Sequence, residues 1–374
     1  MTIRKALASR LYYTACCFVL FFLSAAASFN GYYDKWHFAE SGLSGEDPRF
    51  HFEMMVDGTA NRPYVYRQFL PACANWIDRA VPDSFKRWLN HQQGVGAEPQ
   101  EDPFLDSATA ANPAYSFRYL IVYFATFLFA LLAVYAMYLV GGALETPRPA
   151  ALLAPIIVIL LVPYIESDGG YFYDYPELAF FALAVWVALM FDWWWIIPVA
   201  ALGTWNKESF LLFVPTLYPF LRQRNSRLGA WMAIGVLCLV CAAVHYPIRL
   251  HFAHNPGSAM EMHWRDQLYW LQQPRNLLFG MDKTYGVRVL KAFTLGPMAL
   301  LAFAVWRGWP HLPRAVQRHA QIAAAINVPL YLLFCWPGEL RDFSLLYVVF
   351  LLVLASNLSE WFGTSAPASA PVSG

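Results

Sequence analysis

The chain has 374 residues, of which 58% are apolar and only 14% are charged, and its formal net charge is +1. Soluble domains are rarely this poor in charge, so the composition argues against a soluble enzyme and favours an integral membrane protein. The near-neutral net charge gives no sign of a nucleic-acid partner.

Apolar stretches recur along the chain and predict about ten transmembrane helices. Several are shorter than the roughly 20 residues that a perpendicular span needs, so they must tilt or be shielded by their neighbours. The fold class predicted is an all-α integral membrane protein, with a single polytopic membrane domain over residues 1–362 and a disordered tail over 363–374. The expected spans are residues 11–29, 117–143, 150–165, 178–191, 193–205, 209–221, 229–248, 291–306, 320–337 and 343–358.

Lysine and arginine in the short connections predict the orientation of these spans. With the N-terminus on the cytoplasmic side, the inner connections carry most of these residues, and the short outer turns carry only Lys207 and Arg341. If residues 193–221 formed a single span, the later connections rich in arginine would lie on the outer side, and this bias would be reversed. Two short helices are therefore expected to meet at residues 206–209. A cleaved signal peptide is the alternative for the N-terminal stretch, but its apolar run is longer than most signal cores.

Two long external segments are expected, residues 30–116 and 249–290. The first predicts helices at 63–80 and 83–93, and the second of these has the aromatic face typical of a helix lying in the membrane interface. The other segment predicts one interfacial helix that ends before Pro274.

Acidic side chains gather in the turn between the third and fourth spans, residues 166–177, which contains Asp168 and Asp174 but no lysine or arginine. Ionisable groups at membrane depth are costly and usually functional. A cation, an acceptor hydroxyl or a basic group from another loop must compensate this charge. Lys207 and Arg341 are the expected compensators.

Other ionisable side chains lie at the ends of predicted spans on the same side. Asp34 follows the first span and is placed to accept a proton from a hydroxyl, although it also suits the headgroup layer as a plain helix end. Lys207 is placed to hold a leaving phosphate, with Glu208 orienting Lys207 or a neighbouring base, and the alternative is an exposed polar turn. Arg341 and Glu339 suit the same roles of a phosphate-binding cation and an orienting acid. The alternative is a simple ion pair at a helix end.

Two further features have a structural and a functional interpretation. Arg67 offers a guanidinium fork for a phosphate, although arginine at an interface often only extends to lipid phosphate. Pro176 and Glu177 are explained by the start of a helix, with proline at the first position and an acid near the helix dipole. The histidines match no strong zinc signature, so no metal site is predicted.

Three motifs together resemble the GT-C superfamily of integral membrane glycosyltransferases, most closely a poorly characterised bacterial branch. They are a Tyr-Arg-x-x-Leu-Pro-like stretch at residues 66–71, an Asn-Lys-Glu-Ser turn at 206–209 and a late Glu-x-Arg at 339–341. The resemblance covers most of the chain, and each motif alone is weak.

The resemblance implies that Asp34 and Asp174 are the catalytic acids, with Asp168 as a substitute for the second. Many relatives carry two adjacent acids in the first loop, whereas here Asp34 precedes a lysine and the acidic pair Glu46-Asp47 comes later, so the identity of the base stays open.

The remaining candidates, by the same resemblance, bind substrate. They are Arg67, Asp168, Lys207, Glu208, Glu339 and Arg341.

The implied reaction is inverting transfer of a sugar from a polyprenyl-phosphate donor to a hydroxyl of a glycan, lipid or protein. It would occur on the periplasmic face of the bacterial inner membrane, within membrane lipids and as part of cell-envelope synthesis. No cofactor is expected, and a divalent cation stays open. The alternatives are a ten-span secondary transporter, for which no internal repeat is visible, and an envelope polysaccharide polymerase or ligase.

Overall fold

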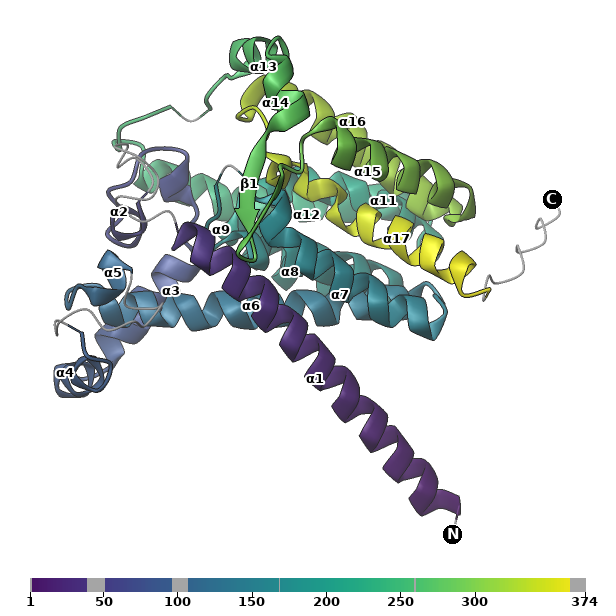
Figure 1. The fold of residues 1–374 in the computed structure, drawn as a ribbon, viewed down its shortest axis with the longest axis horizontal. Helices are drawn as coiled ribbons and strands as arrows, with labels where there is room; N and C mark the ends of the chain where they lie inside the picture. The colour runs from purple at the N-terminus through teal and green to yellow at the C-terminus, as the bar shows by residue number, and fades with distance from the viewer. Residues whose placement is uncertain (1, 39–50, 96–106, 168, 259, 364–374) are drawn as a thin grey trace.

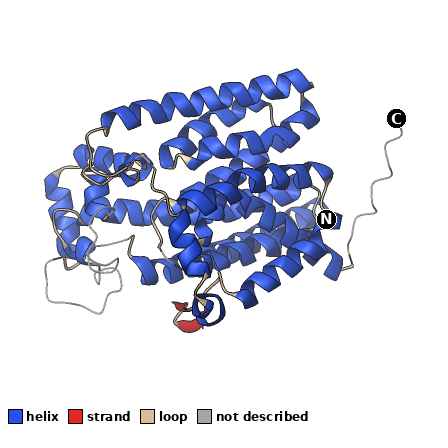
Figure 2. Ribbon diagram, turned by 90° about the horizontal axis from the view of Figure 1, so that it is seen from above, coloured by secondary structure: helices blue, strands red, loops and turns tan. Residues whose placement is uncertain are grey.

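The computed structural model describes residues 2–38, 51–95, 107–167, 169–258 and 260–363, with side chains from Tyr12 onward. Within these residues the fold is almost entirely α-helical, and the helices run side by side in a bundle (Figures 1 and 2). The predicted tail lies outside them, apart from Gly363.

Helices occupy all ten predicted spans. They are α1 (Thr2–Trp36), α6 (Ser116–Ala143), α7 (Arg148–Ile165), α8 (Asp174–Met190), α9 (Ile196–Asn206), α10 (Ser209–Phe213) with α11 (Tyr218–Arg224), α12 (Arg227–His251), α15 (Leu295–Gly308), α16 (Arg314–Phe334) and α17 (Tyr347–Trp361). Short 3-10 helices lead into three of these elements: η3 (Trp193–Trp195), η4 (Val214–Leu217) and η6 (Leu340–Leu346); another, η5 (Trp309–His311), follows α15.

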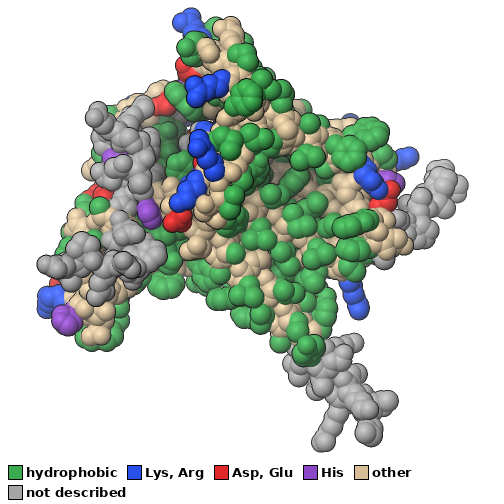
Figure 3. Space-filling model, viewed as in Figure 1, with side chains coloured by type: hydrophobic (Ala, Val, Ile, Leu, Met, Phe, Trp, Pro, Cys, Tyr) green, Lys and Arg blue, Asp and Glu red, His purple; other side chains and the backbone are tan. Residues whose placement is uncertain are grey.

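Five helical segments among the described residues are long and apolar enough to cross a membrane: Tyr12–Trp36, Ser116–Ala143, Arg148–Ile165, Arg227–His251 and Leu340–Trp361. Apolar side chains cover much of the surface between charged groups at its opposite ends (Figure 3). These features indicate a membrane protein.

α8 is the central helix. Most of its 17 residues are buried, and α6, α9, α11 and α17 pack around it. A helix that is apolar on all sides is stable only when it is covered on all sides. Neighbouring helices therefore shield α8, as its short length requires.

The chain reverses between α9 and α10, as the distribution of arginines predicts. Lys207, after α9, reaches Glu177 near the start of α8, whereas Arg224, at the end of α11, donates a hydrogen bond to the carbonyl oxygen of Leu189 near the end of α8 (3.4 Å). The segment from α10 to α11 therefore returns along α8. The prediction of two short helices that meet at residues 206–209 is confirmed.

The two long segments predicted to be external contact each other. The side-chain amide of Asn255 donates to the carbonyl oxygens of Gly58 (2.8 Å) and Ala60 (2.9 Å). The first segment contains α2 (Phe52–Val56), η2 (Tyr64–Tyr66), α3 (Phe69–Ala80), α4 (Asp83–Gln92) and α5 (Ala108–Ala111).

The second segment contains α13 (Trp264–Leu271), the helix expected before Pro274, and α14 (Pro274–Phe279). A β-hairpin that the sequence analysis did not predict follows, formed by β1 (Met281–Thr284) and β2 (Val287–Leu290). Its turn residue Tyr285 packs against Gly31 of α1, and Asp282 forms an ion pair with Lys35. The hairpin therefore fastens the second segment to the end of α1.

The expectation that α1 ends near residue 29 and leaves Asp34 in a loop is wrong. α1 continues to Trp36 because Tyr32 and Trp36, one helical turn apart, pack together against Gly170. Apolar contacts thus extend the helix through a sequence whose polar residues suggested an end. Asp34 is exposed on the last turn of α1.

Close packing of α9 on α10 predicts opposite effects of alanine at two helical glycines. A Cβ on Gly203 would overlap the ring of Phe210, whereas a Cβ on Gly235 of α12 meets open space. We expect Gly203→Ala to lower the free energy of unfolding by about 1–3 kcal/mol, the usual cost of overpacking. Gly235→Ala should leave it unchanged or raise it by up to about 1 kcal/mol.

The measurement is the unfolding of the purified variants in detergent micelles. Equal effects of the two substitutions would contradict this packing.

Candidate functional site

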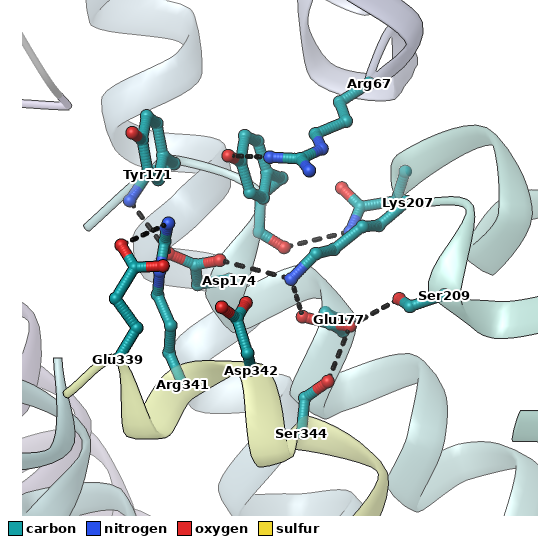
Figure 4. A network of polar contacts seen from close by, with 12 residues as sticks. Arg67, Tyr171, Asp174, Glu177, Lys207, Ser209, Glu339, Arg341, Asp342 and Ser344 are labelled. Atoms are coloured by element: carbon teal, nitrogen blue, oxygen red, sulfur yellow. Dashed lines mark hydrogen bonds and ion pairs between the residues drawn. The ribbon is translucent and has the colours of Figure 1, made fainter. Parts of the chain in front are cut away.

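A network of charged side chains lies where several helices begin or end at one end of the bundle (Figure 4). Its members come from segments far apart in the sequence. They are Arg67 after η2, Tyr171 and Tyr173 before α8, Asp174 and Glu177 in α8, Asn206, Lys207, Glu208 and Ser209 at the α9–α10 turn, and Glu339, Arg341, Asp342 and Ser344 around η6. We call this set the polar network.

The centre of the polar network is an ion pair between Lys207 and Glu177. Nζ of Lys207 lies 2.7 Å from Oε2 of Glu177, and both residues are buried. The other carboxylate oxygen, Oε1, accepts hydrogen bonds from the hydroxyls of Ser209 and Ser344 (2.9 Å for Ser344). α8, α10 and η6 are thus joined through one carboxylate.

Asp174 lies beside this pair and contacts both compensating cations. Its Oδ2 accepts a hydrogen bond from the backbone N–H of Tyr171 (2.8 Å) and lies 3.7 Å from Nη1 of Arg341, while Oδ1 lies 4.0 Å from Nζ of Lys207. Lys207 and Arg341 therefore compensate the acidic turn as expected. Glu339 completes the group through an ion pair with Arg341 (3.1 Å).

Two stacked tyrosine rings form one wall of the polar network. The rings of Tyr171 and Tyr173 are 5.0 Å apart and nearly parallel, with an interplanar angle of 6°. The guanidinium of Arg341 lies 4.5 Å from the Tyr171 ring, and that of Arg67 lies 4.5 Å from the Tyr173 ring. Each arginine is held by a cation–π contact in addition to its hydrogen bonds.

Arg67 and Glu208 form the most accessible edge of the network. Nη2 of Arg67 donates to Oε1 of Glu208 (3.3 Å), Nη1 donates to the hydroxyl of Tyr173, and one third of the Glu208 side chain is exposed. Burial disfavours the charged carboxyl of Glu208, but the positive charge of Arg67 outweighs this effect and lowers the pKa of Glu208 below its ordinary value. A substrate can therefore meet charged Arg67 and Glu208 first.

Glu166, directly after α7, is a buried acid that also feels the charges of the polar network. Its backbone carbonyl accepts hydrogen bonds from Lys35 (2.9 Å) and from the indole of Trp36 (3.0 Å). Burial, followed by repulsion from Asp174, raises the pKa of its carboxyl well above the ordinary value. Burial therefore favours the neutral form of Glu166.

Several buried polar atoms of the network have no hydrogen-bond partner among the described residues. They are Nε of Arg67, Nε and Nη1 of Arg341, Oδ1 of Asp174, Oε2 of Glu166 and Oε2 of Glu208. Buried donors and acceptors of this kind are costly unless they are satisfied. The network therefore contains both donors and acceptors that no described residue satisfies.

The network contains most of the residues that the sequence singled out. Arg67, Asp174, Lys207, Glu208, Glu339 and Arg341 lie together, whereas Asp34 is exposed and has no hydrogen bond or ion pair with a described residue. Asp34 lies half a helical turn from Tyr32 and Trp36, which face the acidic turn. Asp168 and the pair Glu46-Asp47 lie outside the described residues.

Glu177 is the principal residue whose role the sequence does not reveal. It lies in the first turn of α8, as expected for an acid near the helix dipole, and it also binds Lys207 and two serines. Its spacing of three residues from Asp174 puts both carboxylates on one face of α8. That spacing was the available signal.

Among the described residues, no group of three or more His, Cys, Asp or Glu side chains is arranged to hold a metal ion. No protein-family model, curated protein or solved structure matches the chain.

The central ion pair predicts strong coupling between Glu177 and Lys207. Removing one partner of a buried pair leaves an uncompensated charge, so Glu177→Gln should lower the free energy of unfolding by about 3–5 kcal/mol. The double variant Glu177→Gln/Lys207→Met should lose much less than the sum of the two single variants, because it leaves no unpaired charge.

The exposed pair of Arg307 and Glu360 is the matched control. Glu360→Gln should change the free energy of unfolding by less than about 1 kcal/mol. Additive losses at Glu177 and Lys207 in equilibrium unfolding would contradict their pairing.

Proposed function

We propose that the chain is a membrane glycosyltransferase that transfers a sugar from a polyprenyl-phosphate donor to an acceptor hydroxyl. The observation that carries this proposal is the convergence of Arg67, Lys207 and Arg341 with buried carboxylates around two stacked tyrosine rings. Guanidinium and ammonium groups suit a phosphate. The resemblance of residues 66–71, 206–209 and 339–341 to GT-C enzymes supports the same reaction class.

In this proposal a carboxylate takes the proton of the acceptor hydroxyl, and the hydroxyl oxygen bonds to the anomeric carbon. The bond from that carbon to the phosphate oxygen breaks with inversion, and the polyprenyl phosphate leaves with the bonding electrons. Lys207, Arg341 and Arg67 stabilise the negative charge on the leaving phosphate. Glu208 and Glu339 orient the arginines with which they pair.

We assign the role of base to Asp174 in preference to Asp34. Oδ1 of Asp174 is buried without a hydrogen-bond partner and lies within the network, whereas Asp34 is exposed outside it. A base must lie within hydrogen-bond reach of the acceptor hydroxyl, and that hydroxyl must lie beside the anomeric carbon of a donor whose phosphate the cations of the network would hold.

The two acids give a direct test of this assignment. Asp174→Asn should reduce transfer by about 10²- to 10⁴-fold, the usual contribution of a positioned base, and Asp34→Asn should retain most of it. The measurement is mass spectrometry of lipid-linked sugars and envelope glycans from cells with the wild-type chain, with each variant and without the chain. Thermal unfolding of each purified variant controls for loss of fold.

Loss of transfer in Asp34→Asn alone would move the base to Asp34. Glycans that do not depend on the chain, together with solute uptake that does, would reject glycosyl transfer in favour of a transporter. A glycan built from diphosphate-linked donors would indicate a polymerase or ligase.

We further propose that the ten apolar helical stretches cross the bacterial inner membrane, with the N-terminus in the cytoplasm and the polar network on the periplasmic side. Arg222 and Arg224 at the end of α11 and Arg227 at the start of α12 flank the turn between these helices, as expected for the cytoplasmic side. The network lies at the opposite end of α8 from Arg224.

Labelling of single cysteines tests this orientation. Ser258 and Gln223 are both exposed, one in the second long segment and one before the α11–α12 turn. In a chain whose native cysteines are replaced by serine, an impermeant maleimide should label Ser258→Cys in intact spheroplasts, and Gln223→Cys only after lysis. The reverse pattern would overturn the proposed orientation.

A further inference from the structure

A polar cavity of about 300 Å³ opens on the second long segment and shares no residue with the polar network. Its polar side chains are Arg275 and Asn276 from α14, Arg288 from β2, and Lys291 directly after β2. We call this cavity the cationic pocket. It brings three basic residues together from separate structural elements.

No carboxylate occurs among the described residues that line the cationic pocket. Arg275 and Arg288 form no hydrogen bond or ion pair with any described residue, whereas Lys35 and His263 in the same region have acidic partners, Asp282 and Asp266. The charges of Arg275 and Arg288 are therefore not balanced by any described residue.

The hairpin adds independent evidence of unbalanced charge. Arg288 pairs directly with Lys283 in the antiparallel register, and directly opposed residues project from the same face of a sheet. Like charges in such a pair destabilise a hairpin. An anion bound beside Arg288 would offset the repulsion between Arg288 and Lys283.

The walls of the cationic pocket are held by contacts of their own. The backbone N–H of Lys291 donates to the carbonyl oxygen of Gly280 (2.7 Å), which closes the base of the hairpin onto the end of α14. The side-chain amide of Asn276 donates to the carbonyl oxygen of Trp270 (3.3 Å), and the Trp270 ring packs on Phe293. These hydrogen bonds and this ring contact thus hold the backbone segments that carry the basic residues.

Exposed apolar side chains adjoin the cationic pocket. Phe279, which lines it, is 69% exposed, and Leu278 and Met281 are also exposed. Basic residues beside exposed apolar groups are typical of a surface that lies at a membrane interface. Such a surface suits an anionic headgroup with an attached hydrocarbon chain.

We propose that the cationic pocket binds a phosphoryl group, supplied by a phosphorylated lipid or by a free phosphorylated solute. The guanidinium of an arginine fits phosphate oxygens with two parallel hydrogen bonds, and the two positive charges of Arg275 and Arg288 match the roughly −2 charge of a phosphate monoester. This site is separate from the proposed catalytic site, and its ligand is bound without being converted.

The test measures binding of farnesyl phosphate, inorganic phosphate and farnesol to the purified full-length chain in neutral detergent, by isothermal titration calorimetry. Arg275→Gln/Arg288→Gln should weaken binding of the phosphorylated probe by at least about tenfold, the effect of losing charged hydrogen bonds. The matched control is Arg265→Gln, since Arg265 is an exposed arginine of α13 that does not line the pocket.

Binding of farnesyl phosphate that exceeds binding of both inorganic phosphate and farnesol, and that the double variant loses, identifies a lipid phosphate. Equal binding of both phosphates, lost in the double variant, identifies a free phosphorylated solute. Unchanged binding in the double variant, or no binding to the wild-type chain, overturns the proposal. Loss of binding in Arg341→Gln alone would place the phosphate at the polar network instead, so failure of this site is distinct from failure of the proposed transferase.

Discussion

The buried ion pair between Lys207 and Glu177 is the interaction on which the arrangement of the bundle end depends. It joins the start of the central helix α8 to the turn between α9 and α10, and the same carboxylate also binds η6 through Ser344. A buried charge without a partner is strongly destabilising. The three chain segments must therefore meet in one arrangement if either charge is to remain buried.

This requirement explains features that apolar packing alone would not. α9 stops at Asn206 because Lys207 adopts an extended backbone that directs its ammonium toward Glu177, and the chain then turns back in α10. The side-chain amide of Asn206 donates to the carbonyl oxygen of Tyr173 (2.9 Å) and so fixes the tyrosines relative to this turn. The same turn thus positions both the stacked tyrosine rings and Lys207.

The polar network and the cationic pocket are two different electrostatic environments in one protein. In the network, each of the three cations pairs with at least one acid, and individual buried donors and acceptors have no hydrogen bond to a described residue. In the cationic pocket, all charged side chains among the described lining residues are basic. The first environment suits proton transfer and a charge that develops during a reaction, whereas the second suits stable binding of an anion.

The sequence alone determined the membrane class, the positions of the helices and the turn at residues 206–209, because hydrophobic segments and the bias of arginines are local signals. It also identified Asp174, Lys207 and Arg341, since ionisable groups between apolar stretches are rare enough to be informative.

Only the tertiary structure decided which acids meet which cations. Glu177 seemed explained by its own helix, and Asp34 seemed well placed at the end of a span, because a sequence shows distance along the chain and not which face of a helix a residue occupies. The hairpin at residues 281–290 was also decided by tertiary contacts: its strands are four residues long, too short for a reliable pattern, and its turn is held by Gly31 and by the carbonyl oxygen of Leu160. Pairings between distant segments depend on packing of the whole bundle, and no local pattern of residues encodes them.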